Sequence, residues 1–203
     1  MTDDEPGFFD VVRRQRAHRA FAPTPVEDAV VERVLECATY APSAENRQPW
    51  VFVVVRDDTT RAAIADLTER AWAAGGRAFA EQRLDPKLLA EVDEGIAGGG
   101  YRAAPVLVVV CADLERCLRQ TVASSIFPAV QNLLLAAGAL GLGSALTTLG
   151  IQDGAELTEL LALPDPVVPQ AVVPLGYPAR PLGLSRRDPV ATRTHRDRYG
   201  TPW

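Results

Sequence analysis

The sequence predicts an α/β or α+β fold built on a mixed sheet. Periodic apolar segments alternate with short apolar runs in the order helix, helix, strand, helix, strand, helix, strand, helix, strand. Runs such as Val51–Val55 contain almost no polar residue, which is typical of strands buried on both faces. The 203 residues contain no repeat, low-complexity block or shift in composition, so we expect one domain over residues 1–203.

Local signals predict where the elements begin and end. Thr24, Pro25 and Glu27 have the spacing of an N-cap, a first helical residue and a capping box, so a helix is expected from there to just before Pro42. Asp153 opens a second capping box and a short helix. The other expected elements are helices over 8–19, 57–72 and 121–141 and strands over 50–56, 105–111, 144–148 and 171–175.

Two segments carry weaker signals. Residues 75–100 contain two glycine clusters and a mixed-charge stretch, which predicts short helices on mobile joints; this is either a lid over a site or an exposed excursion. Residues 177–203 are rich in Pro, Gly and Arg and have no core of their own. We therefore expect an extended C-terminal arm that lies on something else. The helix over 121–141 is apolar around most of its circumference, which indicates a central helix or a dimer interface.

Composition restricts the class of protein. A net charge of −5 and a pI near 5.1 argue against a nucleic-acid binder and against an anionic membrane surface as partner. The acidic residues 1–5 do not form a secretory signal, and no uninterrupted apolar run reaches the length of about 18 residues expected of a membrane helix. Cys37, Cys111 and Cys117 have no metal-ligand spacing and indicate thiols in a reducing compartment. The expected location is cytoplasmic, with no metal.

The loop Ala41–Trp50 joins a predicted helix to a predicted strand. Its two prolines restrict the backbone, and between them Ser43, Asn46 and Gln48 offer both donors and acceptors. Such a set either satisfies its own hydrogen bonds in a tight connection or binds the edge of a heteroaromatic ring.

Two arginine clusters stand out in this acidic chain. One contains Arg13, Arg14, Arg16, His18 and Arg19, and the other contains Arg180, Arg186 and Arg187. Guanidinium groups suit a phosphate dianion, although either cluster alone is also explained by a solvated basic face. The sequence contains no catalytic triad by spacing, no Gly-x-Gly-x-x-Gly after a strand and no P-loop. An enzyme with this sequence is therefore expected to borrow its reactive group from a redox cofactor.

Several of these stretches together resemble the nitroreductase family of FMN-dependent oxidoreductases. The resemblance covers almost the whole chain. It rests on Gln15–Phe21 ahead of Pro25-Val26, on Ala41–Trp50, on the apolar helix followed by Gly141–Ser144, and on Val172–Pro178 with the later Arg186-Arg187. Gln15 and Ala17 stand where the family usually has arginine and serine, so each removes a donor.

The resemblance implies a three-layer α+β fold with a mostly antiparallel sheet and an intertwined homodimer. It also implies FMN at two interface sites. The phosphate, ribityl chain and pyrimidine edge would lie near Arg16, Ala17, His18 and Arg19, with Arg186 or Arg187 closing on the phosphate. Pro42, Ser43 and Asn46 would approach from the other side, from the same or the other subunit, and Thr147, Thr148 and Leu149 would lie along the ring system near N5.

The implied activity is transfer of a hydride from NADH or NADPH through flavin N5 to a small aromatic acceptor, a nitroaromatic or a quinone, by a ping-pong mechanism. No side chain is expected as a catalytic residue in its own right; Arg19 and Thr148 are supporting groups. Three alternatives stay open at this point: a flavin-dependent dehalogenase or oxidase on the same fold, a flavin-binding or storage protein without turnover, and a dimeric α/β protein that binds another phosphorylated ligand.

Overall fold

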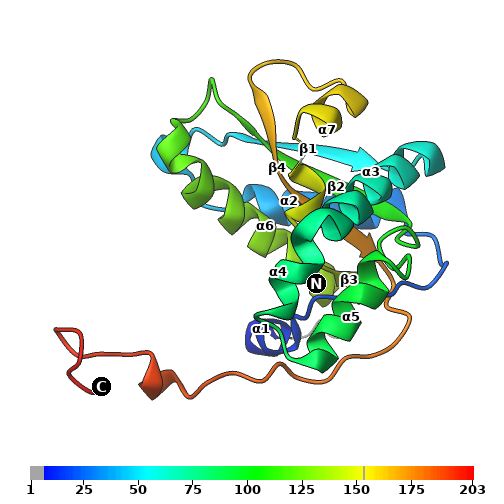
Figure 1. Cartoon of the computed structure of the whole chain (residues 1–203). Coiled ribbons are helices and arrows are strands. Elements are labelled where there is room, and N and C mark those ends of the chain that lie inside the picture. Colours follow the sequence, from blue (N-terminus) through cyan, green and yellow to red (C-terminus); the bar gives the residue numbers. More distant parts are fainter. Residues whose placement is uncertain (1–6, 153) are drawn as a thin grey trace.

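A four-stranded sheet forms the centre of the computed structural model, which describes residues 7–152 and 154–203 (Figure 1). Its strands lie in the order β1 (Trp50–Val55), β2 (Val106–Asp113), β4 (Val167–Gly176) and β3 (Gly143–Ser144), and each neighbouring pair is antiparallel. The parallel component is a single bridge between Ala17 and Ser144 beside β3. The expected α+β class with a mostly antiparallel sheet is confirmed.

Helices cover both faces of the sheet. Alternate residues of β2 point in opposite directions, and because all of them up to Ala112 are apolar, both faces carry side chains that must be buried. Val106, Val108 and Val110 pack with α2 (Asp28–Thr39) and α6 (Val122–Ala139). Leu107, Val109 and Cys111 face α3 (Asp58–Ala71) and α7 (Gly154–Leu160) on the other side. The result is the expected three-layer arrangement, with β2 buried along its length except for Asp113.

The long apolar helix α6 is part of the core. Ile126, Ala129, Val130 and Leu133 are fully buried within the chain. Among the described residues, Arg119–Ala139 is the one helical stretch long and apolar enough to cross a membrane, and half of its apolar window is buried inside the protein. The other half faces outward and includes Gln131.

The region of weak sequence signals folds into short helices, as expected. A π-helical turn, η2 (Trp72–Gly76), continues α3 and leads into α4 (Arg77–Glu81), and α5 (Pro86–Ile96) follows. Asp93 of α5 joins these pieces: it accepts a 2.9 Å hydrogen bond from Nε1 of Trp72 and is paired with the Arg77 guanidinium at 3.1 Å. Trp72, Leu89, Ile96 and Tyr101 form a separate buried cluster below these helices.

Some boundaries differ from the predicted ones. The first helix, α1 (Phe8–Arg14), stops well before Arg19, because the following residues run extended beside β3 and the C-terminal segment: His18 donates its amide to Ser144 O and Ala22 to Tyr177 O. The prediction of a capping box at Thr24 is wrong. Val26 is buried in the core, so α2 begins only at Asp28, after Glu27 in an extended conformation.

Other boundary differences follow from the sheet. The predicted strand over 144–148 is shorter, since after β3 only Thr147 makes a bridge, to Val172 of β4. Strand β4 is longer than expected, and a register shift between Val110 and Cys111 of β2 leaves Gln170 of β4 unpaired, as in a β-bulge. Three-residue 3-10 turns occupy Ala44–Asn46 (η1), Arg119–Thr121 (η3), Leu149–Ile151 (η4) and Val190–Thr192 (η5). The acidic residues 1–5 and the predicted cap Asp153 lie outside the described residues.

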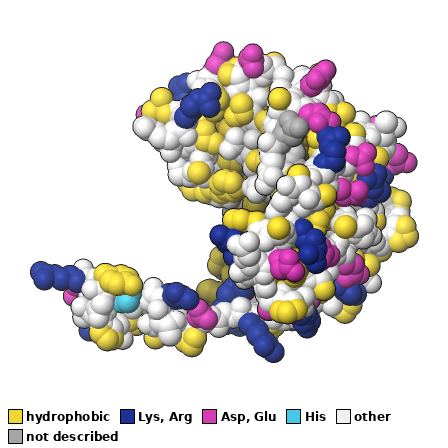
Figure 2. Space-filling model, viewed as in Figure 1, with side chains coloured by type: hydrophobic (Ala, Val, Ile, Leu, Met, Phe, Trp, Pro, Cys, Tyr) yellow, Lys and Arg dark blue, Asp and Glu magenta, His cyan; other side chains and the backbone are white. Residues whose placement is uncertain are grey.

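The C-terminal segment begins on the body and ends away from it. Its first part runs beside residues 15–22, with hydrogen bonds from Ala179 N to Ala20 O and from Arg16 Nη1 to Gly183 O. Beyond this contact the chain extends away from the other elements, as the ribbon and the space-filling view show (Figures 1 and 2). Val190, Tyr199 and Trp203 in this arm are 70–93% exposed.

Candidate functional site

The two arginine clusters, which are far apart in the sequence, meet at one cleft. The cleft has a volume of about 930 Å³, within the range of roughly 300–1,000 Å³ typical of small-molecule sites. Its walls are formed by residues 15–19, which run beside β3, by the first turns of α5 and by the start of the C-terminal arm. They include Gln15, Arg16, Ala17, Arg19, Asp85, Lys87, Leu88, Glu91, Leu146, Leu184, Ser185, Arg186 and Arg187. Five of these side chains are cationic and two are carboxylates, so the cleft favours an anionic ligand.

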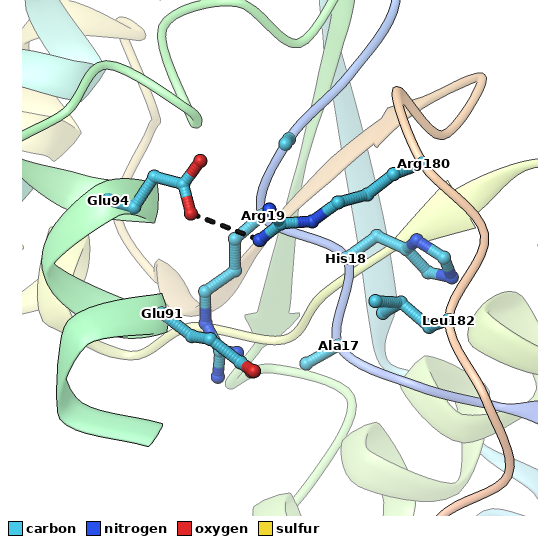
Figure 3. Close-up of a pocket in the computed structure, with 8 residues that line it drawn as sticks. Ala17, His18, Arg19, Glu91, Glu94, Arg180 and Leu182 are labelled. Atoms are coloured by element: carbon cyan, nitrogen blue, oxygen red, sulfur yellow. Dashed lines mark hydrogen bonds and ion pairs between the residues drawn. The ribbon is translucent and has the colours of Figure 1, made fainter. Parts of the chain in front are cut away.

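Arg19 is held at the base of this cleft. Its side chain lies alongside the helix that carries Glu91 and Glu94 (Figure 3). The positive charge of Arg19 acts on the phenol of Tyr101, where it opposes the rise in the pKa that burial causes. Within the described part of the chain, no ion pair involves Arg16, Arg19, Arg186 or Arg187, whereas seven other arginines pair with carboxylates. Positive charge is therefore available to a ligand.

Arg16 connects the cleft to the arm. Its Nη1 atom donates to the carbonyls of Gly183 at 3.0 Å and Leu184 at 3.5 Å, and Ser185 Oγ donates to Gln15 O at 3.4 Å. These bonds hold the backbone of the arm at the rim, and with it Arg186 and Arg187, whose side chains are exposed. The N–H groups on Nε and Nη2 of Arg16, three of its five donors, make no hydrogen bond to the described residues and are left for a bound anion.

The segment after β3 reaches the cleft through Leu146, whereas the predicted site residues Thr147, Thr148 and Leu149 do not line it. Thr147 is buried and fixed by two backbone hydrogen bonds to Val172, of 3.0 and 2.9 Å, and its hydroxyl accepts a 3.2 Å hydrogen bond from the Leu149 amide. Thr148 is exposed. Burial raises the pKa of Tyr101 above its ordinary value, while Arg19 and the Thr147 hydroxyl act in the opposite direction.

His18 lines a second, smaller pocket and not the main cleft. Together with Glu94, Arg180 and Leu182 it borders a small pocket of about 20 Å³, large enough for one water molecule, which Arg19 and Glu91 also line (Figure 3). Arg180 spans this pocket in a 3.0 Å ion pair with Glu94. Burial, and then the positive charge of Arg16, lower the pKa of His18 below 6.5. A neutral imidazole is thus favoured beside the arginines.

The loop Ala41–Trp50 is strained and well anchored. Glu45, Asn46 and Gln48 all have φ between 50° and 55°, an uncommon conformation for residues other than glycine. Ala44 N donates to the buried Ser125 Oγ at 3.1 Å and Gln48 N to Ser43 Oγ at 3.0 Å, and Gln48 Nε2 is 3.3 Å from Asn46 Oδ1. Its polar groups thus partly satisfy one another, yet the strain and exposure of Asn46 are typical of a functional loop.

The structure does not bring this loop to the cleft of the same chain. Trp50 pairs with Ala112 at one end of β2, whereas Leu175, the partner of Ser144 in β3, pairs with Val106 at the other end. The eight residues of β2 therefore separate Pro42, Ser43 and Asn46 from the arginine cleft by roughly 20 Å.

Sequence reasoning identified neither the residues that α5 contributes to the cleft nor the buried Tyr101. Lys87 and Glu91 line the cleft and Gly95 contacts Arg19, but α5 lies in the stretch with the weakest periodicity. Lys87, the single lysine of the chain, was one available signal. Tyr101 follows Gly98-Gly99-Gly100, which resembles no nucleotide-binding motif, so only its position in three dimensions indicates a role.

Comparison with known proteins places the chain in a family. The nitroreductase family model matches residues 12–177. A protein of Archaeoglobus fulgidus that carries an NADH dehydrogenase/NAD(P)H nitroreductase name is 32% identical over 83% of this chain and 83% of its own length. An iodotyrosine deiodinase of Thermotoga neapolitana is 28% identical, covering 91% and 96% respectively.

A solved structure agrees with this match. A nitroreductase of Desulfovibrio desulfuricans, crystallised in complex with FMN, is 29% identical and superposes with a TM-score of 0.75 over 96% of this chain and 99% of its own. The structural match thus covers nearly the whole of both chains. This chain therefore belongs to the nitroreductase family of oxidoreductases.

Proposed function

We propose that this protein is an FMN-dependent oxidoreductase that uses NADH or NADPH to reduce a small aromatic acceptor, a nitroaromatic or a quinone, by a ping-pong mechanism. The observation that carries the proposal is the cleft in which Arg16 and Arg19, near the start of the chain, face Arg186 and Arg187, near its end. Within the described residues these arginines form no ion pair, and a phosphate dianion is the ligand that such a set of donors favours.

The residues of the cleft fit FMN by their chemistry. Arg16 and either Arg186 or Arg187 would bind the phosphate, and Ala17 would leave room beside the ribityl chain without adding a charge; His18, which does not line the cleft, would not contact the cofactor. Arg19 would face the pyrimidine edge, and Thr147, Thr148 and Leu149 would offer hydroxyl and amide groups along the ring. When bound, FMN would supply the hydride-carrying chemistry that no side chain of the cleft supplies.

The side chains then bind and orient and take no part as acid or base. Arg19 places positive charge where the bound ring accumulates negative charge, a form of electrostatic stabilisation that needs no proton transfer by the protein. Thr148 is exposed next to the buried Thr147, so its hydroxyl and amide are available to the ligand. The helices α4 and α5, with Asp85, Lys87 and Glu91 on the cleft wall, would form the lid over the acceptor.

We propose further that the active form is an intertwined homodimer. The separation of about 20 Å between the loop Ala41–Trp50 and the arginine cleft is a reason to expect that Pro42, Ser43 and Asn46 act on the site of a second copy. Phe8 and Phe9 are about 70% exposed on α1, a degree of apolar exposure that a partner surface would remove.

On such a partner, the arm would lie in a groove beside α2. A groove of about 420 Å³ runs along α2 beside the free edge of β1, lined by Val31, Leu35 and Val54 and bordered by acidic side chains: Asp28, Glu32 and Glu36. The free arm carries exposed aromatic residues together with Arg193, Arg196 and Arg198. Apolar and charge complementarity both favour the arm of one copy in the groove of the other.

Charge and cysteine content bear on other binding partners and on the location in the cell. The acidic chain is not expected to bind nucleic acid or an anionic membrane. Three free cysteines, of which Cys37 is exposed, favour the reducing cytoplasm.

A visible spectrum of the purified protein, followed by anaerobic titration with NADH and NADPH, tests the activity. We expect a flavin spectrum that is bleached by a nicotinamide and restored by a quinone, and an Arg19→Ala variant with less bound flavin and slower reduction. A protein that takes up no FMN would contradict the proposal, and one that binds FMN without turnover would be a storage protein.

Complementation tests the shared site. Arg19→Ala and Asn46→Ala are each expected to impair activity, but a co-expressed mixed dimer would contain one site with both native residues. Activity in that mixed dimer above the level of either parent supports the homodimer. Equal activity of the two single variants and the mixed preparation, or sedimentation as a monomer at micromolar concentration, would contradict the homodimer.

One second reaction is favoured by a specific observation. Because the deiodinase of Thermotoga neapolitana covers 91% of this chain, reductive dehalogenation of a halogenated phenol is the alternative activity. Halide release from an iodophenol by the reduced protein would distinguish the two.

A further inference from the structure

Ser125 is a fully buried polar side chain in the apolar helix α6, at the point where that helix meets the loop Ala41–Trp50. Its buried neighbours on the helix, Val122 and Ile126, are apolar. A hydroxyl in such surroundings is tolerated only when it is hydrogen-bonded. Ser125 Oγ accepts a 3.1 Å hydrogen bond from the amide of Ala44, so the polar group of the core helix is directed at the loop.

The bond to Ala44 lies directly before the strained part of the loop. Glu45, Asn46 and Gln48 have φ angles of 55°, 54° and 50°. This left-handed conformation is unfavourable for residues with a Cβ atom, and a turn that contains it persists only when its surroundings fix it. The hydroxyl of Ser125 supplies such a constraint from outside the loop.

The rest of the turn closes on itself around Asn46. The Asn46 amide donates to Ser43 O at 3.0 Å, and the Gln48 amide donates to Ser43 Oγ at 3.0 Å. Gln48 Nε2 donates to Asn46 Oδ1 at 3.3 Å. Beyond the turn, the Asp113 amide donates to Pro49 O at 2.8 Å. The turn is therefore a small unit that α6 holds at its start and the end of β2 holds at its end.

We propose that the Ser125 hydroxyl is a positioning group for Asn46: it holds the turn in the orientation that presents the Asn46 side chain to the flavin site of a second copy. The inference rests on the proposed function, in which Asn46 acts on that site. Ser125 is buried within its own chain, so it acts through the loop and not on the cofactor. A core helix thereby pre-organises a binding group at the surface, and less ordering of the loop is left to the moment of binding.

The test is the dissociation constant for FMN of the Ser125→Ala variant, which removes only the hydroxyl. We expect it to rise about two- to tenfold, the loss that corresponds to one hydrogen bond that orders the loop. In an Asn46→Ala background, Ser125→Ala should raise the dissociation constant almost no further, because the two residues act as one unit. A merely structural role of Ser125 would lower stability, but its effect on FMN would not depend on Asn46.

The matched control is Ser124→Ala. Ser124 is the exposed neighbour on the same helix, and its hydroxyl donates to Thr121 O at 3.0 Å, so this variant also loses one serine hydroxyl and one hydrogen bond. It should leave the FMN affinity unchanged. Ser125→Cys keeps a side chain of similar size with a weaker acceptor, so its dissociation constant should rise less than that of Ser125→Ala. Ser125→Cys also replaces the alanine variant in both backgrounds if the latter does not fold.

Three outcomes would contradict the inference, and they are distinguishable. A wild-type protein that binds FMN while Ser125→Ala keeps its affinity, or loses the same affinity with and without Asn46, would overturn this inference alone. Full FMN affinity in Asn46→Ala would overturn it together with the shared site. A wild-type protein that binds no FMN would overturn the proposed function and this inference with it.

Discussion

Replacing Gly95 by alanine tests how the arginine of the cleft is held. Gly95 is the residue before the end of α5, and an added methyl group would lie 2.6–3.0 Å from Cβ, Cγ and Cδ of Arg19. These atoms belong to the start and middle of the side chain, which cannot move aside without shifting the backbone or the guanidinium. Overpacking of this kind costs about 1–3 kcal/mol. The helix propensity of alanine offsets at most about 1 kcal/mol of this.

Gly154→Ala is the matched control, since Gly154 begins α7 and has no atom within 4 Å of the position of its Cβ. Both variants gain helix propensity, so the difference between them isolates the overpacking. In urea unfolding of the cofactor-free protein we expect Gly95→Ala to be about 1–3 kcal/mol less stable than Gly154→Ala.

Displacement of Arg19 should also weaken the cleft for its ligand. Loss of one charge-assisted hydrogen bond corresponds to an affinity about tenfold lower or more, measured by quenching of FMN fluorescence. If Gly95→Ala and Gly154→Ala have equal stability and equal FMN affinity, the space beside Gly95 does not position Arg19 and the reasoning from the geometry is wrong.

Three further changes test other parts of the structure. Burial and the charge of Arg16 lower the pKa of His18 below 6.5, so the unfolded chain binds the proton more readily than the folded protein. The stability that neutral His18 contributes is therefore complete above this pH and is lost as the pH falls. The free energy of unfolding of the cofactor-free protein, measured at about pH 8 and about pH 5.5, should differ less between the two pH values in His18→Gln than in the wild type. Asp93→Asn weakens the pairing with Arg77 and should cost about 1–3 kcal/mol, with faster hydrogen exchange over Trp72–Glu81; unchanged exchange there would contradict the role of Asp93 as the link to α5. Leu133→Ala removes a fully buried side chain between α6 and the sheet and should lower the free energy of unfolding by about 2–5 kcal/mol, whereas a loss below about 1 kcal/mol would show that the core there is loosely packed.

The sequence by itself determined the elements and the type of ligand chemistry. Apolar runs without alternation predict strands buried on both faces, and in β2 both sets of alternate side chains are covered by helices. For Val51–Val55 this prediction is wrong: the run forms β1, in which Val55 is buried but Val54 is exposed, because β1 lies at the edge of the sheet. The arginine clusters and the loop Ala41–Trp50 were recognisable because side-chain chemistry and proline restrictions are local properties. Local signals misplaced the start of α2, since the burial of Val26 in the core outweighs the capping box at Thr24.

Only the tertiary structure decided which of these residues meet. Arg16 and Arg186 share a cleft because the arm runs back along residues 15–22, a contact between segments about 170 positions apart that no local pattern encodes. The same long-range packing puts the loop that carries Asn46 at the far end of β2. The chemistry of a side chain is a property of one residue and can be read from the sequence. The distance between two residues far apart in the sequence depends on how the whole sheet is paired, and that pairing forms the site.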